Sequence, residues 1–422
     1  MSLKRRFDVL VCGAGPVGLT AALALVRRGG LEVEIVDEAD VRAGLSYALA
    51  LHPSTLAELA KLGVADELVA QGRAVDRIAF YDGAERRLEL SVATLGGPYP
   101  FVLVLPQNAL EDVLLRALEH ADVQVRYRHR LAQIDPGAAN GVSCSIDRME
   151  LASAGYGVSR SEWTIGKRHE VAVPFVIGAD GHNSLVRRQL GIERRSVGAP
   201  GVFATFELVT PTSAPDEMCI TLANGTRNVW WPLPGERVRM SFEIDDEDAP
   251  TSARRKSRLP SFVPWLTRSL DDERLHQLVA ERMPWLRCPE GSLMWSVAVR
   301  FERALVDTFG RGRVWLAGDA AHLAFPFGVH SMNAGMCEAV DLADRIGLVA
   351  RGIENVAALD AYGRVQRAEW EARLGLGGGG HALASGTDWD MAHADAILES
   401  LPVSRADAGP LLAQAGIRLP TR

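Results

Sequence analysis

The pattern Gly13-x-Gly15-x-x-Gly18 constrains the fold of this chain more than any other feature of the sequence. It lies between an apolar run, Phe7–Cys12, and a segment rich in Ala and Leu, Leu19–Arg28. This order predicts a buried strand, a tight turn and a helix. Glycines at this spacing allow the tight turn, close approach of the backbone to a pyrophosphate, and close packing of the helix on the strand.

An acidic residue follows the second predicted strand, Glu32–Val36. Asp37, with Glu38 after it, lies about 20 residues beyond the glycines, where a carboxylate can hold a ribose hydroxyl of a dinucleotide. The helix that begins at Pro16-Val17 would direct its positive end at the phosphates. The sequence therefore predicts a βαβ unit that binds a dinucleotide, without indicating which one.

Two more acidic residues follow apolar runs later in the chain. The run Val173–Ile177 leads to Asp180, and the run Val314–Ala317 leads to Gly318-Asp319. A carboxylate after a buried strand can accept hydrogen bonds from a sugar-like chain, and a following helix can stabilise an anionic ring edge. Taken alone, Asp180 is equally well explained as the cap of a turn.

In this order and spacing, the three motifs resemble those of the class A flavoprotein monooxygenases, the FAD-dependent family with a para-hydroxybenzoate-hydroxylase-like fold. The resemblance covers roughly residues 7 to 370. It implies an α/β fold: a FAD/NAD(P)-binding Rossmann-like (GR2-type) domain, an inserted antiparallel-sheet substrate domain and C-terminal helices. We expect residues 1–75, 101–197 and 286–350 to form the FAD-binding domain, residues 76–100 and 198–285 the substrate-binding domain, and residues 351–422 a C-terminal helical region.

The resemblance also implies which residues bind FAD. The glycine turn would hold the ADP half, Asp180 would serve both FAD and the nicotinamide cofactor, and Gly318-Asp319 would hold the ribityl chain. Gln107 matches a family glutamine that contacts FAD. The full set of expected cofactor residues is Gly13, Gly15, Pro16, Val17, Gly18, Asp37, Glu38, Arg42, Gln107, Asp180, Gly318, Asp319, Pro326, Gly328, Ser331, Met332 and Asn333.

The activity implied by the resemblance is a hydroxylation. NADH or NADPH would reduce FAD, O₂ would add to give a flavin C4a-hydroperoxide, and one oxygen would pass to an aromatic or polycyclic phenol-like small molecule. A flavin-dependent oxidase or dehydrogenase of the same fold is an alternative. A halogenase is another, although Trp230-Trp231-Pro232 matches the WxWxIP motif of halogenases only faintly. A FAD-binding protein without turnover is the third.

The segment after Gly318-Asp319 departs from the family pattern. The family commonly reads Pro-Pro-x-Gly-Gly-x-Gly-x-Asn, whereas this chain reads Phe-Pro-Phe-Gly-Val-His-Ser-Met-Asn. Val329 and Ser331 occupy glycine positions, and Phe325 occupies a proline position. Because a β-branched residue avoids positive φ, these substitutions predict an altered loop geometry beside the flavin ring.

Several side chains are candidates for the substrate site. Tyr47 stands where the family often has an arginine, for which Arg42 could substitute. Only one of two adjacent tryptophans should face the interior, because side chains alternate along a strand. The candidates for substrate contact are Tyr47, Phe203, Trp230, Trp231 and Phe327, with core packing as the alternative for the aromatic residues of the predicted substrate sheet.

His330 is the candidate catalytic residue, because an imidazole titrates near neutral pH and could bind a substrate oxygen or transfer a proton. The alternative is a solvent-facing residue or a helix cap.

Composition limits the other possibilities. A net charge of −7 and a pI of about 5.9 do not fit the basic surface of a nucleic-acid-binding protein. Five cysteines without a CxxC pair indicate neither a metal site nor a disulfide framework. The apolar runs are too short to span a membrane. We expect a cytoplasmic protein without a bound metal, and the sequence leaves its oligomeric state open.

Overall fold

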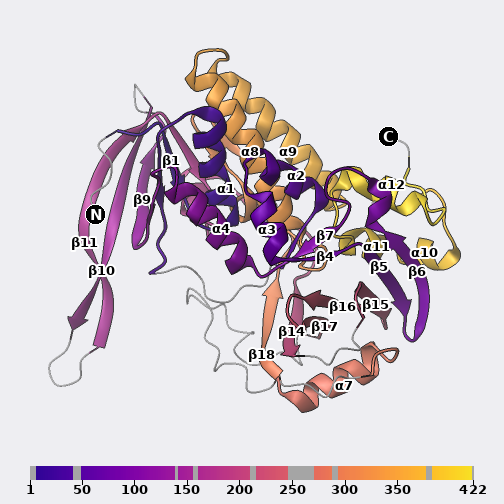
Figure 1. Cartoon of the computed structure of the whole chain (residues 1–422). Coiled ribbons are helices and arrows are strands. Elements are labelled where there is room, and N and C mark those ends of the chain that lie inside the picture. The colour runs from indigo at the N-terminus through magenta and orange to yellow at the C-terminus, as the bar shows by residue number, and fades with distance from the viewer. Residues whose placement is uncertain are drawn as a thin grey trace.

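The computed structural model describes residues 6–40, 49–137, 141–154, 160–209, 215–245, 270–287, 293–376 and 383–420 (Figure 1). Its centre is a six-stranded sheet in the order β20-β21-β12-β1-β2-β8, in which every neighbouring pair is parallel except β20–β21. The strands are β1 (Val9–Cys12), β2 (Val33–Val36), β8 (Val125–Arg126), β12 (Phe175–Gly178), β20 (Gly310–Arg311) and β21 (Val314–Leu316). The strands β1, β2, β12 and β21 are buried at every residue, as expected for a parallel sheet covered on both faces.

Helices pack around this sheet and around one another. Helix α1 (Pro16–Ala24) lies against α4 (Gln107–Glu119) and α8 (His330–Ala350), and α9 (Leu359–Arg373) lies against α8 (Figure 1). The predicted first helix is present: α1 continues into a π-helical turn, Leu25–Gly29, and stops at Gly30, whose φ is 64°. Two further helices, α2 (Pro53–Lys61) and α3 (Ala65–Gln71), belong to this part.

A three-stranded antiparallel sheet adjoins the parallel one. Its strands are β9 (His129–Asp135), β10 (Val142–Ala154) and β11 (Arg160–Val173), in the order β11-β10-β9. The long β10–β11 hairpin lies at the left of Figure 1. Two small sheets join the parts: β3 (Ala50–Leu51), β4 (Arg73–Val75) and β7 (Val102–Val104), and β13 (Arg194–Ser196), β19 (Ala304–Val306) and β22 (His322–Leu323).

The second large sheet has seven strands in the order β18-β14-β17-β16-β15-β5-β6, all antiparallel except the β15–β5 pair. The strands are β5 (Arg77–Asp82), β6 (Glu85–Ser91), β14 (Gly201–Val209), β15 (Met218–Ala223), β16 (Thr226–Leu233), β17 (Arg237–Ile244) and β18 (Leu293–Phe301). One face packs its apolar residues with those of α7 (Asp272–Arg282), and the other face packs with the C-terminal helices.

One strand of the seven-stranded sheet comes from a segment that the expected domain bounds place elsewhere. Residues 286–350 are expected in the FAD-binding domain, but β18 pairs with β14 at the edge of the seven-stranded sheet. The sheet therefore continues to Phe301. The physical reason is that this pairing joins segments about 90 residues apart in sequence, a contact that local periodicity does not reveal.

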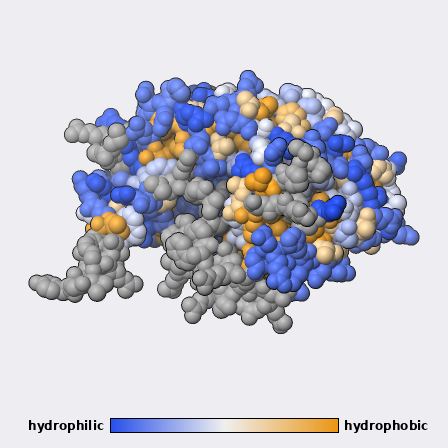
Figure 2. Space-filling view, turned by 60° about the horizontal axis from the view of Figure 1, so that its bottom comes forward, coloured by the Kyte–Doolittle hydropathy of each residue, from blue (hydrophilic) through white to orange (hydrophobic). Residues whose placement is uncertain are grey.

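The C-terminal segment contains α10 (Asp388–Ala392), α11 (Ala394–Ser400) and α12 (Arg405–Ala413), shown in yellow beside β5 and β6 in Figure 1. Among the described residues visible in Figure 2, hydrophilic side chains predominate, and hydrophobic ones gather in separate patches. Within the described ranges, no helix combines the length and apolar character needed to cross a membrane. The expected α/β architecture, a Rossmann-like parallel sheet joined to an antiparallel sheet, is confirmed.

Candidate functional site

The sequence motifs meet at one edge of the parallel sheet. The strands β21, β12, β1 and β2 run in the same direction, so their carboxyl ends lie side by side. Backbone hydrogen bonds continue past the strands: Gly13 donates its N–H to Val36, and Ala179 donates to Cys12, each over 2.8 Å. Ligands of open α/β sheets bind outside the carboxyl ends of the strands, which makes this edge the candidate cofactor site.

The three glycines of the first motif have different roles. Gly13 has φ +105°, and a Cβ there would lie 2.1 Å from the Ala179 carbonyl oxygen. A Cβ at Gly18 would lie 2.0 Å from the Gly13 carbonyl oxygen, so these two positions are required by backbone packing. A Cβ at Gly15 would meet no atom within 4 Å. Gly15 precedes Pro16 at the start of α1, so the open space lies where a helix N-terminus can bind a phosphate.

Asp37 holds the glycine turn from the end of β2. Its Oδ2 accepts the Ala14 N–H over 2.7 Å, and its Oδ1 accepts the Ala39 N–H over 2.8 Å. Each carboxylate oxygen can accept more than one hydrogen bond, so the group can still accept a ribose hydroxyl. Glu38 is exposed beside it.

Asp180 combines a structural contact with an unpaired oxygen. Its Oδ2 accepts the N–H groups of Leu185 and Val186, over 2.6 and 3.1 Å, at the start of α5 (Leu185–Gln189). Its Oδ1 is buried and has no hydrogen-bond partner among the described residues. Burial raises the pKa of this carboxyl group. An orphaned carboxylate oxygen is costly to bury, so it fits a site that a ligand donor completes.

The Gly318-Asp319 turn packs directly on the first motif. Gly318 has φ +63°, and a Cβ there would lie 2.8 Å from the Val17 side chain. A Cβ at Gly335 of α8 would lie 2.8 Å from the Cα of Gly318. Asp319 is exposed at this turn and accepts a hydrogen bond from the Ser331 hydroxyl over 2.5 Å. The third motif therefore lies against the first and keeps its carboxylate accessible.

Glu338 of α8 supports this turn and is not among the site residues expected from the sequence. The buried carboxylate accepts the Gly318 N–H over 3.1 Å, His322 Nε2–H over 2.9 Å and Trp370 Nε1–H over 2.5 Å. Burial by itself would raise the pKa of Glu338, but the His322 interaction and the other hydrogen bonds outweigh burial and lower it. In the sequence, Glu338 is a lone acidic residue between apolar neighbours, which gives no sign of its buried partners.

The loop before α8 keeps a glycine-like backbone without the glycine. Val329 has φ 53° and ψ 35°, the left-handed conformation, and caps the helix. Asn333 Nδ2–H donates to the Val329 carbonyl over 2.9 Å, and Asn333 Oδ1 accepts the His52 N–H over 2.8 Å. His52 Nε2–H donates to the Gly328 carbonyl over 2.7 Å, and burial lowers the His52 pKa to about 3. These tethers hold Val329 in a positive-φ conformation that its side chain opposes, so the backbone change expected at this position is not seen.

His330 lies buried under this loop. Its Nδ1 lies 2.9 Å from Arg373 Nη1 of α9, and its ring meets the His52 ring edge to face at 5.5 Å between centroids. A Cβ on Gly328 would lie 2.4 Å from His330 Nε2. These contacts favour a role for His330 in supporting the loop. His330 is not among the residues that line the small cavity beside this loop, and its role in catalysis stays a prediction.

A small cavity lies between the loop and the seven-stranded sheet, with room for about one water molecule. Its lining residues are Leu49, Thr205, Val229, Trp231, Ser241, Phe301, Pro326 and Phe327. Thr205 and Ser241 face each other across β14 and β17, with their hydroxyl oxygens 3.1 Å apart. None of the described residues that line this cavity is charged.

The aromatic candidates divide between the two faces of the sheet. Trp231 and Phe327 line the cavity. Phe203 is buried behind it, with its ring centroid 4.9 Å from that of Phe327. Trp230 packs on the opposite face with the α7 cluster and donates its Nε1–H to the Pro215 carbonyl over 3.3 Å.

The remaining candidates are less informative. Gln107 lies at the start of α4, with its amide donating to Glu111 over 2.7 Å, and Met332 is partly buried in the first turn of α8. Arg42 and Tyr47 lie outside the described residues. In the described part of the chain, no group of three or more His, Cys, Asp or Glu side chains could hold a metal ion.

Comparisons with known proteins show the family to which this chain belongs. The family model described as "FAD binding domain" matches residues 6–373. The chain is 31% identical over 361 residues to a 6-methylpretetramide 4-monooxygenase of Streptomyces rimosus, covering 84% of this chain and 58% of that protein. It is 26% identical over 370 residues to a para-nitrophenol 4-monooxygenase of Pseudomonas sp. strain WBC-3, covering 84% and 81%. The chain spans between half and two thirds of the length of several curated relatives.

Solved structures give the same fold. A p-nitrophenol 4-monooxygenase from Pseudomonas putida DLL-E4 superposes with a TM-score of 0.71 at 19% identity, covering 94% of both chains. A complex of aklavinone-11 hydroxylase with FAD and aklavinone gives a TM-score of 0.66 at 23% identity, covering 88% of this chain and 69% of that one. The match over residues 6–373 shows that this chain belongs to the FAD-binding domain family of the class A flavoprotein monooxygenases.

Proposed function

We propose that this protein is a FAD-dependent monooxygenase that uses NADH or NADPH and O₂ to hydroxylate an aromatic or polycyclic phenol-like small molecule. One observation carries the proposal. The loop containing Pro326 and Phe327 follows the Gly318-Asp319 turn and the short strand β22, and it forms one wall of the cavity. This loop would therefore connect the residues that would hold FAD with those that would hold the substrate.

The residues at the carboxyl edge fit FAD. The open space at Gly15 and the start of α1 suits the pyrophosphate, and Asp37 suits the adenosine ribose. The unpaired Asp180 Oδ1 and the exposed Asp319 carboxylate supply acceptors for ligand hydroxyl or amide groups. When bound, FAD would supply the redox chemistry, taking a hydride from the nicotinamide and activating O₂.

The protein's own residues would bind and orient the substrate. Trp231, Phe301 and Phe327 offer flat apolar walls that exclude water. Thr205 and Ser241 supply the hydroxyl groups among the described lining residues, and these hydroxyls would hold an oxygen of the substrate. An uncharged lining favours a phenol or quinone over a substrate recognised through a carboxylate. Because the cavity is small, an aromatic ring requires side chains to move outward.

The proposal is tested in two steps. The apoprotein is titrated with FAD, and NADH and NADPH oxidation is then followed with a panel of phenols and polycyclic phenols under ¹⁸O₂. The expected result is saturable FAD binding and one ¹⁸O atom in the product. Substrate oxidation without ¹⁸O in the product would favour an oxidase or dehydrogenase, which the replacement of two family glycines by Val329 and Ser331 also motivates. Chloride-dependent halogenated product would favour a halogenase.

A further inference from the structure

Two arginines contact the aromatic residues of the loop before α8. The Arg227 guanidinium carbon lies 4.6 Å from the Phe327 ring centroid and 5.1 Å from that of Phe325. The Arg303 guanidinium carbon lies 5.1 Å from the same Phe325 centroid. A guanidinium over an aromatic face is attractive, and more strongly so where water is excluded. The two positive charges therefore both act on the loop that walls the cavity.

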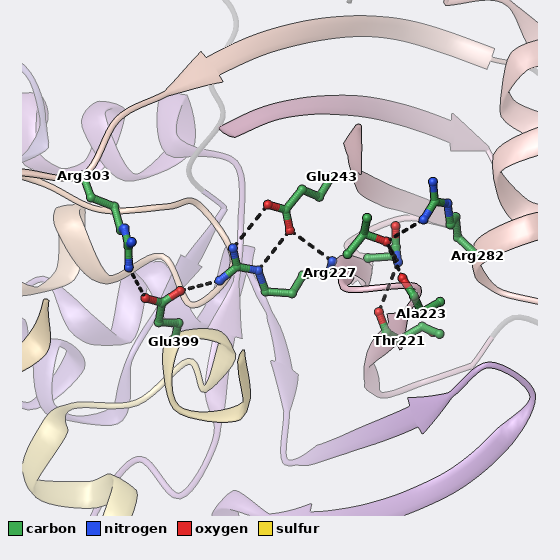
Figure 3. A network of polar contacts seen from close by, with 9 residues as sticks. Thr221, Ala223, Arg227, Glu243, Arg282, Arg303 and Glu399 are labelled. Atoms are coloured by element: carbon green, nitrogen blue, oxygen red, sulfur yellow. Dashed lines mark hydrogen bonds and ion pairs between the residues drawn. The ribbon is translucent and has the colours of Figure 1, made fainter. Parts of the chain in front are cut away.

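Glu399 of α11 joins these arginines (Figure 3). Its Oε1 accepts from Arg303 Nη1 over 2.7 Å, and its Oε2 accepts from Arg227 Nη1. Arg227 also donates Nε–H to Glu243 over 3.0 Å. The Glu399 and Arg227 side chains are only 13% and 15% exposed, so solvent screens this network weakly. Figure 3 shows the Glu399 carboxylate between the two guanidinium groups.

The C-terminal segment also contacts the loop without charges. Ile397 and Leu401 belong to the same apolar cluster as Phe325 and Phe327. A Cβ on Gly328 would lie 2.8 Å from the Leu401 carbonyl oxygen, so the two backbones approach closely. The end of α11 thus contacts the loop through packing and through Glu399.

We propose that Glu399 is a positioning residue for the substrate site, an inference that rests on the proposed function. It holds Arg227 and Arg303 against Phe325 and Phe327, and thereby sets the position of the Phe327 wall of the cavity. Without the carboxylate, two guanidinium groups that share one aromatic partner repel each other, with Glu243 left to neutralise one of them. The C-terminal helices thereby tune substrate binding without contacting the substrate.

The test compares Glu399→Gln with Glu67→Gln, a matched change in an exposed ion pair with Arg116. Both variants are checked for folding by thermal unfolding. Hydrogen exchange of peptides that cover residues 325–329 is then measured on the FAD-loaded protein without substrate. We expect exchange in E399Q to be about tenfold faster in these peptides and unchanged in E67Q. Equal exchange in E399Q and the wild-type protein would overturn the proposal.

Kinetics supply a readout that a purely structural role would not move. We expect E399Q to raise KM for the phenolic substrate about fivefold with kcat within about twofold, because the chemistry itself is untouched. Adding Arg303→Met removes the second positive charge but keeps contact with Phe325, so the double variant should recover slow exchange and low KM. Absence of this recovery would contradict the charge-based explanation. The exchange measurement needs no turnover, so failure to hydroxylate any substrate would count against the proposed function alone.

Discussion

Ser331 donates its hydroxyl to the Asp319 carboxylate over 2.5 Å, so a residue that replaces a family glycine is bonded to the expected ligand of the ribityl chain. If Asp319 binds FAD, Asp319→Ala removes a charged acceptor, and such hydrogen bonds contribute about 1.5–3 kcal/mol. We expect D319A to raise the Kd for FAD between about 10- and 100-fold, measured by flavin fluorescence. Ser331→Ala leaves the carboxylate in place and should change Kd less than about threefold. An unchanged Kd in D319A would remove Asp319 from the FAD site.

Because one Asp180 oxygen has no hydrogen-bond partner among the described residues, we expect the affinity of the protein for FAD to depend on pH. Burial raises the Asp180 pKa in the free protein, and a ligand hydrogen bond donated to Oδ1 would favour the ionised form. FAD binding would then release a proton, so affinity should rise as the pH rises through the raised pKa. Asp180→Asn should flatten this dependence, whereas Asp66→Asn, an exposed control, should keep it. Titrations between about pH 4.5 and 7.5 test this, and an equal slope in D180N would contradict it.

Val329 allows a direct test of backbone strain. A left-handed conformation costs a residue with a side chain about 1–2 kcal/mol, and the buried Val329 side chain contributes about 2 kcal/mol by burial. Val329→Gly loses the burial of the side chain but removes the cost of the left-handed backbone. Its free energy of unfolding should therefore lie within about 1 kcal/mol of the wild-type value. Val329→Ala loses burial without that relief and should be less stable than V329G by about 1 kcal/mol. Urea unfolding measures both, and V329A at least as stable as V329G would show that this φ is not positive in solution.

The parts of the site that the sequence predicted depend on local pattern. Gly13, Gly15 and Gly18 follow a buried strand, and their roles come from turn geometry and spacing. Asp180 and Asp319 follow strands that become parallel neighbours, so one topological rule brings them together.

The parts that the sequence did not predict depend on contacts between distant segments. Glu338 and Glu399 occupy helices, where a lone acidic residue ordinarily faces solvent, and only the folded chain brings arginine, histidine or tryptophan donors to them. Val329 opposes its own backbone preference because Asn333 and His52 bond to the loop. Here tertiary contacts outweigh local propensity.

We expect the Thr205 and Ser241 hydroxyls in the cavity to contribute to substrate binding. If Thr205 and Ser241 hold a substrate oxygen, Thr205→Val removes one hydrogen-bonding group without changing side-chain size much. A neutral hydrogen bond contributes about 1 kcal/mol, so KM should rise about fivefold, and Ser241→Ala should act similarly. Thr164→Val, on the exposed strand β11, is the control. Steady-state kinetics with an accepted phenol decide this, and unchanged KM in both cavity variants would place the substrate oxygen elsewhere.

We expect His52 to make the stability of the apoprotein depend on pH. Its pKa falls to about 3 in the folded protein because the ring is buried, compared with about 6.5 in an unfolded chain. Between these pH values the unfolded chain binds a proton that the folded protein does not bind. The free energy of unfolding should therefore decrease by several kcal/mol as the pH falls from about 6.5 to about 3. His52→Gln can still donate to the Gly328 carbonyl but does not titrate, so it should weaken this dependence. His120→Gln, at an exposed position, should leave the pH dependence unchanged. If the free energy of unfolding changes with pH equally in H52Q and H120Q, His52 is not buried as a neutral ring.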